Sequence, residues 1–124
     1  MDKSIGWNWV NKMGQAWVEK DPHAIPPLFT DDFKYYETPF SEPLTKKSQL
    51  FELWQEVPDS QKDVTFNFEI ISEMGYRYIA HWQCAFTRTP SGKKAFLDGI
   101  FLINLNEQGL CTFFKWWWVT KEIK

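Results

Sequence analysis

The segment from Ala95 to Val119 constrains the fold more than any other part of the chain. It contains two long apolar runs, AFLDGIFLINL and LCTFFKWWWV, joined by the polar sequence NEQG, in which Gly109 closes the turn. Runs rich in β-branched and aromatic residues around a short loop that ends in glycine predict a β-hairpin. Because both runs are apolar at odd and even positions alike, we expect both faces of this hairpin to be covered.

The segments before the hairpin predict helices first and strands later. Apolar residues recur at helical spacing from Ile5 to Trp17, after Ser4, which can cap the helix. Asp21-Pro22 begins a second, short helix. The sequence then predicts a short strand at 33–38, a helix from Thr45 to Val57, and four further strands at 64–73, 76–88, 95–105 and 110–119.

The short turns between the last four strands favour an antiparallel meander. A long meander that follows N-terminal helices is expected to curl around them. The sequence therefore predicts an α+β fold, a cone-shaped curved antiparallel sheet wrapped around N-terminal helices, in a single domain of residues 1–124. The helices of such a fold do not fill the concave side of the sheet, so we expect a ligand pocket there.

The amino-acid composition limits the classes of binding partner that we expect. Aromatic residues make up 19% of the chain, with eight Trp and eleven Phe, which either form a heavy aromatic core or line a ligand cavity or an interface. The net charge is −2 and no basic stripe is present, so nucleic acid is not an expected partner. No apolar run is long enough to span a membrane and no signal-type apolar segment opens the chain, so we expect a cytoplasmic protein.

Cysteine usage and motifs predict no cofactor. Cys84 and Cys111 fall within expected strands, where buried free thiols are the usual state. No Cys/His cluster has zinc-ligand spacing, and no phosphate-binding loop or nucleophile elbow is present. The outer face of the sheet is also apolar in places, which predicts a homodimer that forms through this face.

Three segments carry a resemblance to a known family. FTDDFKYYETPFSEPL (29–44), LDGIFLINLNEQGL (97–110) and FKWWWV (114–119), in this order of elements, resemble the SnoaL-like branch of the nuclear transport factor 2-like superfamily. The resemblance implies the cone-shaped fold. The superfamily includes ketosteroid isomerases, polyketide cyclases, dehydratases, epoxide hydrolases and subunits without catalysis, so the resemblance implies no single activity.

The resemblance also suggests site residues. The general-base Asp of ketosteroid isomerases lies directly before a proline in the segment that matches YYETPFSEP, where this chain has Thr38, which is no carboxylate base. Glu37 is one residue earlier and would point to the opposite face of a strand. Asp98 matches the place of the family's protonated oxyanion-binding Asp. SnoaL-like cyclases use a facing Asp and His for proton transfer, which Asp98 and His81 could supply.

Asp98 and His81 are therefore the candidate catalytic residues. Asp98 is a lone carboxylate in AFLDGIFLI, where burial without a partner would cost free energy or raise its pKa. It is either an acid of the pocket or a residue at a strand end that bonds to neighbouring backbone or faces solvent near Gly99. His81 is either a proton shuttle or a structural or exposed strand histidine. The candidate ligand-binding residues are Tyr36, Trp54, Ile100, Trp116 and Trp118.

Three hypotheses of function follow. The first is a small-molecule-binding domain with an aromatic-lined pocket, whose ligand is compact and mostly apolar. The second is an isomerase, cyclase or dehydratase that uses Asp98 with His81 or Tyr36 for proton transfer. The third is a non-catalytic dimerisation module in which the aromatic side chains fill the cone.

Overall fold

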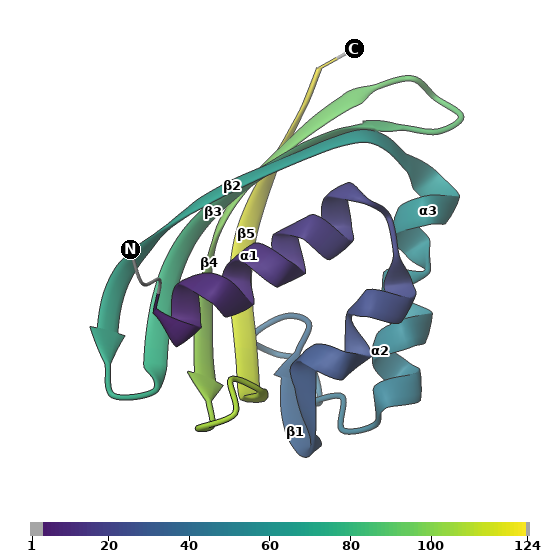
Figure 1. Ribbon diagram of the computed structural model, residues 1–124. Coiled ribbons are helices and arrows are strands. Elements are labelled where there is room, and N and C mark those ends of the chain that lie inside the picture. The colour runs from purple at the N-terminus through teal and green to yellow at the C-terminus, as the bar shows by residue number, and fades with distance from the viewer. Residues whose placement is uncertain (1–3, 124) are drawn as a thin grey trace.

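The computed structural model describes residues 4–123, in which three helices cover the concave side of a curved five-stranded sheet (Figure 1). This arrangement confirms the predicted α+β fold. The helices are α1 (Ile5–Val18), α2 (Lys47–Trp54) and α3 (Glu56–Ser60), with two 3₁₀ turns at Pro22–Ala24 and Pro26–Leu28. The strands are β1 (Phe29–Tyr36), β2 (Gln61–Met74), β3 (Arg77–Arg88), β4 (Lys94–Leu105) and β5 (Cys111–Ile123).

The sheet has the order β1-β5-β4-β3-β2. Strands β2 to β5 form the antiparallel meander that the turns predicted. Strand β1 differs from the prediction in two respects: it spans 29–36 rather than 33–38, and it pairs with β5 in parallel. A parallel pair needs a long crossover, and the helices and the meander between β1 and β5 supply one.

Helix α1 lies in the concave side, where its apolar face packs on the sheet. The Ser4 side chain accepts a hydrogen bond from the Trp7 N–H, which confirms the predicted N-cap. Gly14 permits the close approach of α1 to β2, because a Cβ atom at this position would lie 2.3 Å from the Phe66 ring. The sheet can therefore curve tightly around this helix.

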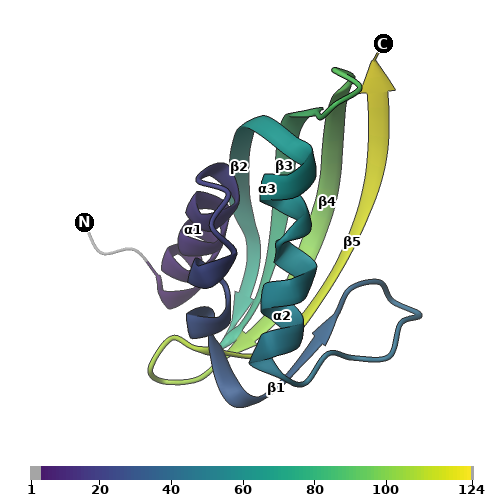
Figure 2. The same cartoon turned by 90° about the vertical axis from the view of Figure 1, so that its right-hand side faces the viewer.

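Side chains alternate between the two faces of the sheet, and the helices lie on one side of it only (Figure 2). On β4 the odd-numbered residues from Ala95 to Leu105 face the helices and the even-numbered residues face outward. The outer face exposes Phe96 (41%), Trp117 (40%) and Val119 (72%).

Two smaller findings bear on the sequence predictions. Cys84 and Cys111 are buried and free, as expected. Among residues 4–123, no helix has the length and apolarity needed to cross a membrane.

Candidate functional site

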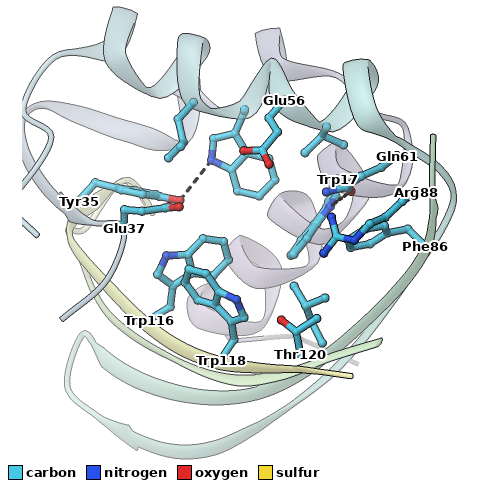
Figure 3. Close-up of a pocket in the computed structure, with 14 residues that line it drawn as sticks. Trp17, Tyr35, Glu37, Glu56, Gln61, Phe86, Arg88, Trp116, Trp118 and Thr120 are labelled. Atoms are coloured by element: carbon cyan, nitrogen blue, oxygen red, sulfur yellow. Dashed lines mark hydrogen bonds between the residues drawn. The ribbon is translucent and has the colours of Figure 1, made fainter. Parts of the chain in front are cut away.

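A cavity of about 200 Å³ opens between the concave face of the sheet and helices α2 and α3 (Figure 3). Strands β3, β4 and β5 form its floor, and β1 supplies one end wall. Six of its fourteen lining residues are aromatic, because inward-facing positions of three strands and two helices carry large rings. The aromatic residues that line the cavity are Trp17, Tyr35, Trp54, Phe86, Trp116 and Trp118.

Glu37 places a carboxyl group at one end of this cavity, beside the aromatic rings. It follows the last residue of β1, and it points to the same side as the buried Tyr35 because side chains alternate (Figure 3). Within residues 4–123 its Oε2 atom is buried without a hydrogen-bond partner. Burial, together with the nearby negative charge of Glu56, raises the pKa of Glu37 to about 7. A carboxyl with this pKa can both take up and release a proton at neutral pH.

Two hydrogen-bond donors lie at the same end of the cavity. The Trp116 indole N–H favours the charged form of Glu37 and partly opposes the rise of its pKa, although the Trp116 Nε1 atom has no hydrogen-bond partner within residues 4–123. The Tyr35 hydroxyl accepts a hydrogen bond from Trp54 Nε1 at 3.3 Å. Burial raises the pKa of Tyr35 well above its ordinary value, so the phenol stays neutral and keeps its proton. These groups can bind a ligand oxygen beside Glu37.

The other end of the cavity is polar as well. Gln61, the first residue of β2, accepts a hydrogen bond from Trp17 Nε1 at 2.9 Å. Arg88, the last residue of β3, is the cross-strand neighbour of Gln61 and bonds through Nε to Glu122. Thr120 of β5 lies near them in the cavity wall. The cavity therefore has two polar ends with aromatic walls between them.

Comparison with known proteins places this architecture in a family. The sequence profile of the SnoaL-like domain matches residues 10–114. The chain belongs to the SnoaL-like family. A comparison with curated protein sequences gave no match.

Solved structures share the fold of this SnoaL-like domain at low sequence identity. A Δ5-3-ketosteroid isomerase from Mycobacterium sp. aligns with a TM-score of 0.79 and 15% identity, over 98% of this chain and 100% of that one. A computationally designed 17-OHP binder aligns with a TM-score of 0.79 and 16% identity, over 98% and 99%. The epoxide hydrolase/cyclase-like enzyme SalBIII aligns with a TM-score of 0.77 and 14% identity, over 91% and 89%. At these identities the likeness establishes the fold alone.

The structure divides the predicted ligand-binding residues between the two faces of the sheet. Trp54, Trp116 and Trp118 line the cavity. Tyr36 lies on the other side of β1, where its ring packs against Phe113 at 5.6 Å. Ile100 is on the outer face of β4, because it alternates with the inward-facing Phe101. That these five residues bind a ligand stays a prediction.

The structure brings the predicted catalytic pair together on the outer face. His81 Nε2 lies 2.9 Å from Asp98 Oδ1, and Gln83 Nε2 donates to Asp98 Oδ2 at 2.9 Å. Glu69 Oε1 lies 3.6 Å from His81 Nδ1. The Asp98 side chain is 49% exposed. Hydrogen bonds from Gln83 and His81 lower the pKa of Asp98, and the hydrogen bond to Asp98 raises the pKa of His81.

This outer-face cluster lies across the sheet from the aromatic cavity, because Asp98 alternates with Leu97, which lines that cavity. The residue matched to the general base, Thr38, bonds instead to the Ser41 hydroxyl at 2.6 Å within the loop. Glu37 is the carboxyl that enters the cavity, and the sequence interpretation had assigned it to the opposite face. The alternation of buried Phe33 and Tyr35, extended by two residues, was the signal that could have identified it.

Proposed function

We propose that this SnoaL-like domain binds a compact, mostly apolar carbonyl compound in the aromatic cavity and that Glu37 moves a proton at the carbon next to the carbonyl. The observation that carries the proposal is the carboxyl of Glu37, half-buried among aromatic rings, with an unpartnered oxygen and a pKa of about 7. A carboxyl that serves only stability is normally paired or solvated. Perturbed acids in apolar cavities are characteristic of proton-transfer sites.

The size and walls of the cavity support the ligand class. Its volume of about 200 Å³ is below the range of roughly 300–1,000 Å³ that is usual for drug-sized ligands, which favours a ligand with one or two rings. Tryptophan and tyrosine rings offer apolar contact area together with N–H and O–H donors. A flat or chair-shaped ring that carries a carbonyl group matches such a lining.

The chemistry follows from the atoms at the Glu37 end. The ionised Glu37 takes a proton from the carbon next to the carbonyl; the C–H bond breaks and its electron pair forms an enolate. The Trp116 N–H and the Tyr35 O–H can donate to the enolate oxygen, which lowers the energy of this charge in an apolar site. The protonated Glu37 either exchanges its proton with solvent or keeps it, and it then gives a proton to the same carbon or, where a C=C bond is conjugated with the enolate, to another carbon. The result is exchange or isomerisation, and the resemblance to ketosteroid isomerase in fold supports this class.

Deuterium exchange tests the proposal. Cyclohexanone in D₂O with the wild-type protein should lose its α-proton signal in NMR spectra faster than cyclohexanone alone. Glu37→Gln removes the base with little change of shape and should abolish the protein-dependent exchange. Glu52→Gln, an exposed Glu of α2 outside the cavity, is the matched control and should exchange like the wild type.

Two results would contradict the proposal. If Glu37→Gln exchanged as fast as the wild type, another group would be the base. If cyclohexanone bound, as shown by a change in tryptophan fluorescence, but never exchanged, the domain would be a binder without proton transfer.

We also propose that a second copy of the chain covers the outer face of the sheet. This face exposes Trp117 and Val119, and it carries acidic Asp98 near basic Lys121, so a two-fold copy can match both kinds of surface. Light scattering should give the mass of a dimer for the wild type. Val119→Lys should reduce that mass to a monomer's, and a monomeric wild type would overturn the dimer.

A further inference from the structure

Gln61 has a defined orientation in the wall of the cavity. Its amide oxygen must be the atom that meets Trp17 Nε1, since an indole N–H is only a donor. The amide NH₂ is then fixed at the other side of the group, and within residues 4–123 it donates to no acceptor. Gln61 is 8% exposed and lines the cavity, so this donor lies in the cavity wall.

Arg88 places further donors beside this amide. The two residues are register partners of β2 and β3, and both side chains line the same cavity. The Arg88 guanidinium carries five N–H donors, and Glu122 takes the Nε edge. The guanidinium also lies 5.2 Å from the centre of the Phe86 ring, which limits its movement. Donors of two side chains therefore converge at one end of the cavity.

This donor end lies across the cavity from Glu37. In Figure 3 Gln61 and Arg88 stand at one side, Glu37 and Tyr35 stand at the opposite side, and Trp116 and Trp118 lie along the wall between them. A molecule that fills the cavity meets both ends at once. Its two polar groups must then lie on opposite sides of an apolar ring.

The charges around the cavity favour a neutral ligand acceptor over an anionic one at Gln61 and Arg88. Arg88 is already neutralised by Glu122, and Glu37 and Glu56 line the same cavity. A ligand anion would meet more carboxyl groups than cations, whereas a neutral carbonyl oxygen accepts from Gln61 and Arg88 without this repulsion.

On these grounds we infer that the ligand carries, opposite the carbon that meets Glu37, a second polar group that is a neutral hydrogen-bond acceptor, held by Gln61 and Arg88. The inference rests on the proposed function for its choice of cavity, and it adds the substrate class: a compact ring with a carbonyl at one end and an amide, ester or ketone at the other. Gln61 and Arg88 are then the residues that determine specificity.

Three cyclohexanones of matched shape test this inference by affinity. They carry at the ring carbon opposite the ketone a carboxamide, a carboxylate or an isopropyl group: 4-oxocyclohexane-1-carboxamide, 4-oxocyclohexane-1-carboxylate and 4-isopropylcyclohexanone. Titration calorimetry gives the dissociation constant of each for the wild type and for two variants. At about pH 8, where the introduced carboxyl is ionised beside Arg88, Gln61→Glu still accepts from Trp17 but donates nothing, and Arg88→Met keeps the apolar stem of the side chain without its donors.

The wild type should bind the carboxamide more tightly than the carboxylate. Each variant should weaken carboxamide binding by about tenfold, the usual effect of losing a buried hydrogen bond to a ligand, and change isopropyl binding by less than about twofold. Thermal unfolding shows whether each variant folds. If one variant does not fold, the affinities of the other variant test the inference.

Three results would overturn the inference: an unchanged carboxamide-to-isopropyl ratio in the folded variants, tighter binding of the carboxylate than of the carboxamide, or no binding of any of the three. Deuterium exchange of the same samples separates the two proposals. If the affinity pattern holds but no exchange occurs, Gln61 and Arg88 bind the second polar group of the ligand, and the proposal of proton transfer by Glu37 is wrong. If exchange occurs without the affinity pattern, the proposed function stands and the inference of a second polar group on the ligand is wrong.

Discussion

Two carboxyl groups on opposite faces of one sheet have opposite electrostatic environments. Glu37 lies among aromatic rings on the concave side, and burial raises its pKa to about 7. Asp98 lies on the convex side, where hydrogen bonds from Gln83 and His81 lower its pKa. The pKa values of the two carboxyl groups therefore shift in opposite directions, upward for Glu37 and downward for Asp98.

The two carboxyl groups also differ in their hydrogen bonds. The Asp98–His81 pair has its hydrogen bonds completed within the sheet, and half of the Asp98 side chain is in contact with solvent. Glu37 lines the cavity, and within residues 4–123 its buried Oε2 atom has no hydrogen-bond partner. The proposed function rests on this difference, because a perturbed acid in a cavity is a candidate for proton transfer.

The strongest test of this comparison removes one carboxyl at a time. Glu37→Gln should lower the rate of α-proton exchange in cyclohexanone by at least about 100-fold, since general-base catalysis contributes roughly 10²–10⁴-fold. Asp98→Asn should leave the rate within about twofold, because Asp98 does not line the aromatic cavity. NMR measurement of exchange in D₂O gives both rates. The reverse pattern would assign the chemistry to the outer-face pair.

The pH dependence of exchange should report the pKa of Glu37. Because the ionised form is the base, the rate should rise with pH, bend near pH 7 and level off above it. Below the bend the rate should fall by about tenfold per pH unit. Glu56→Gln removes a negative charge that raises the pKa of Glu37, so the bend should move to lower pH. A bend near the ordinary pKa of a glutamic acid would contradict the burial of Glu37.

The stability of the protein should fall as pH rises toward neutrality. The pKa of Glu37 is 4.5 in a solvated state and about 7 in the folded protein, so between these values the folded chain holds more protons than the unfolded chain. The free energy of unfolding should drop by about 2 kcal/mol over this interval, a value reduced for partial contact with solvent. Urea unfolding at about pH 5 and about pH 8 measures the drop, and Glu37→Gln should lack it.

The smallest effect should belong to the outer-face pair. The raised pKa of His81 means that its contribution to stability is complete below the ordinary histidine pKa and is lost as pH rises through the raised value. The lowered pKa of Asp98 means that its contribution is lost only in acid. His81→Gln should therefore destabilise the protein slightly in mildly acidic solution. Added salt should erase this difference because the pair is exposed, whereas it should not erase the effect of Glu37.

The sequence predicted most of the fold because the signals for it are local. Turn residues such as Gly75 and Gly109 and the long apolar runs place four strands within a few residues of their observed ends. The parallel pairing of β1 with β5 was not predictable in the same way. It joins segments at opposite ends of the chain, and no turn specifies it.

The site was predictable only in part. The sequence predicts Trp54, Trp116 and Trp118 as ligand-binding residues, and all three line the cavity. The contact of Asp98 with His81 also follows from neighbouring strands. Alternation gives two sets of residues but does not say which set is concave when both are apolar, and β4 and β5 are apolar on both faces. The predicted strand 33–38 also includes Thr38, whereas β1 spans 29–36 and ends before Glu37. The orientation of Glu37 follows from Tyr35, two residues earlier, and not from Thr38.

The strand order also determines when the site can form as the chain is made. Among the strands of the sheet, β1 has β5 as its one neighbour, and β5 is the last of the five along the chain. During synthesis the helices and β2 to β4 emerge while β1 still lacks its partner. Until β5 emerges, the cavity lacks the wall that Trp116, Trp118 and Thr120 supply. We therefore expect a nascent chain to lack the cavity until β5 joins the sheet.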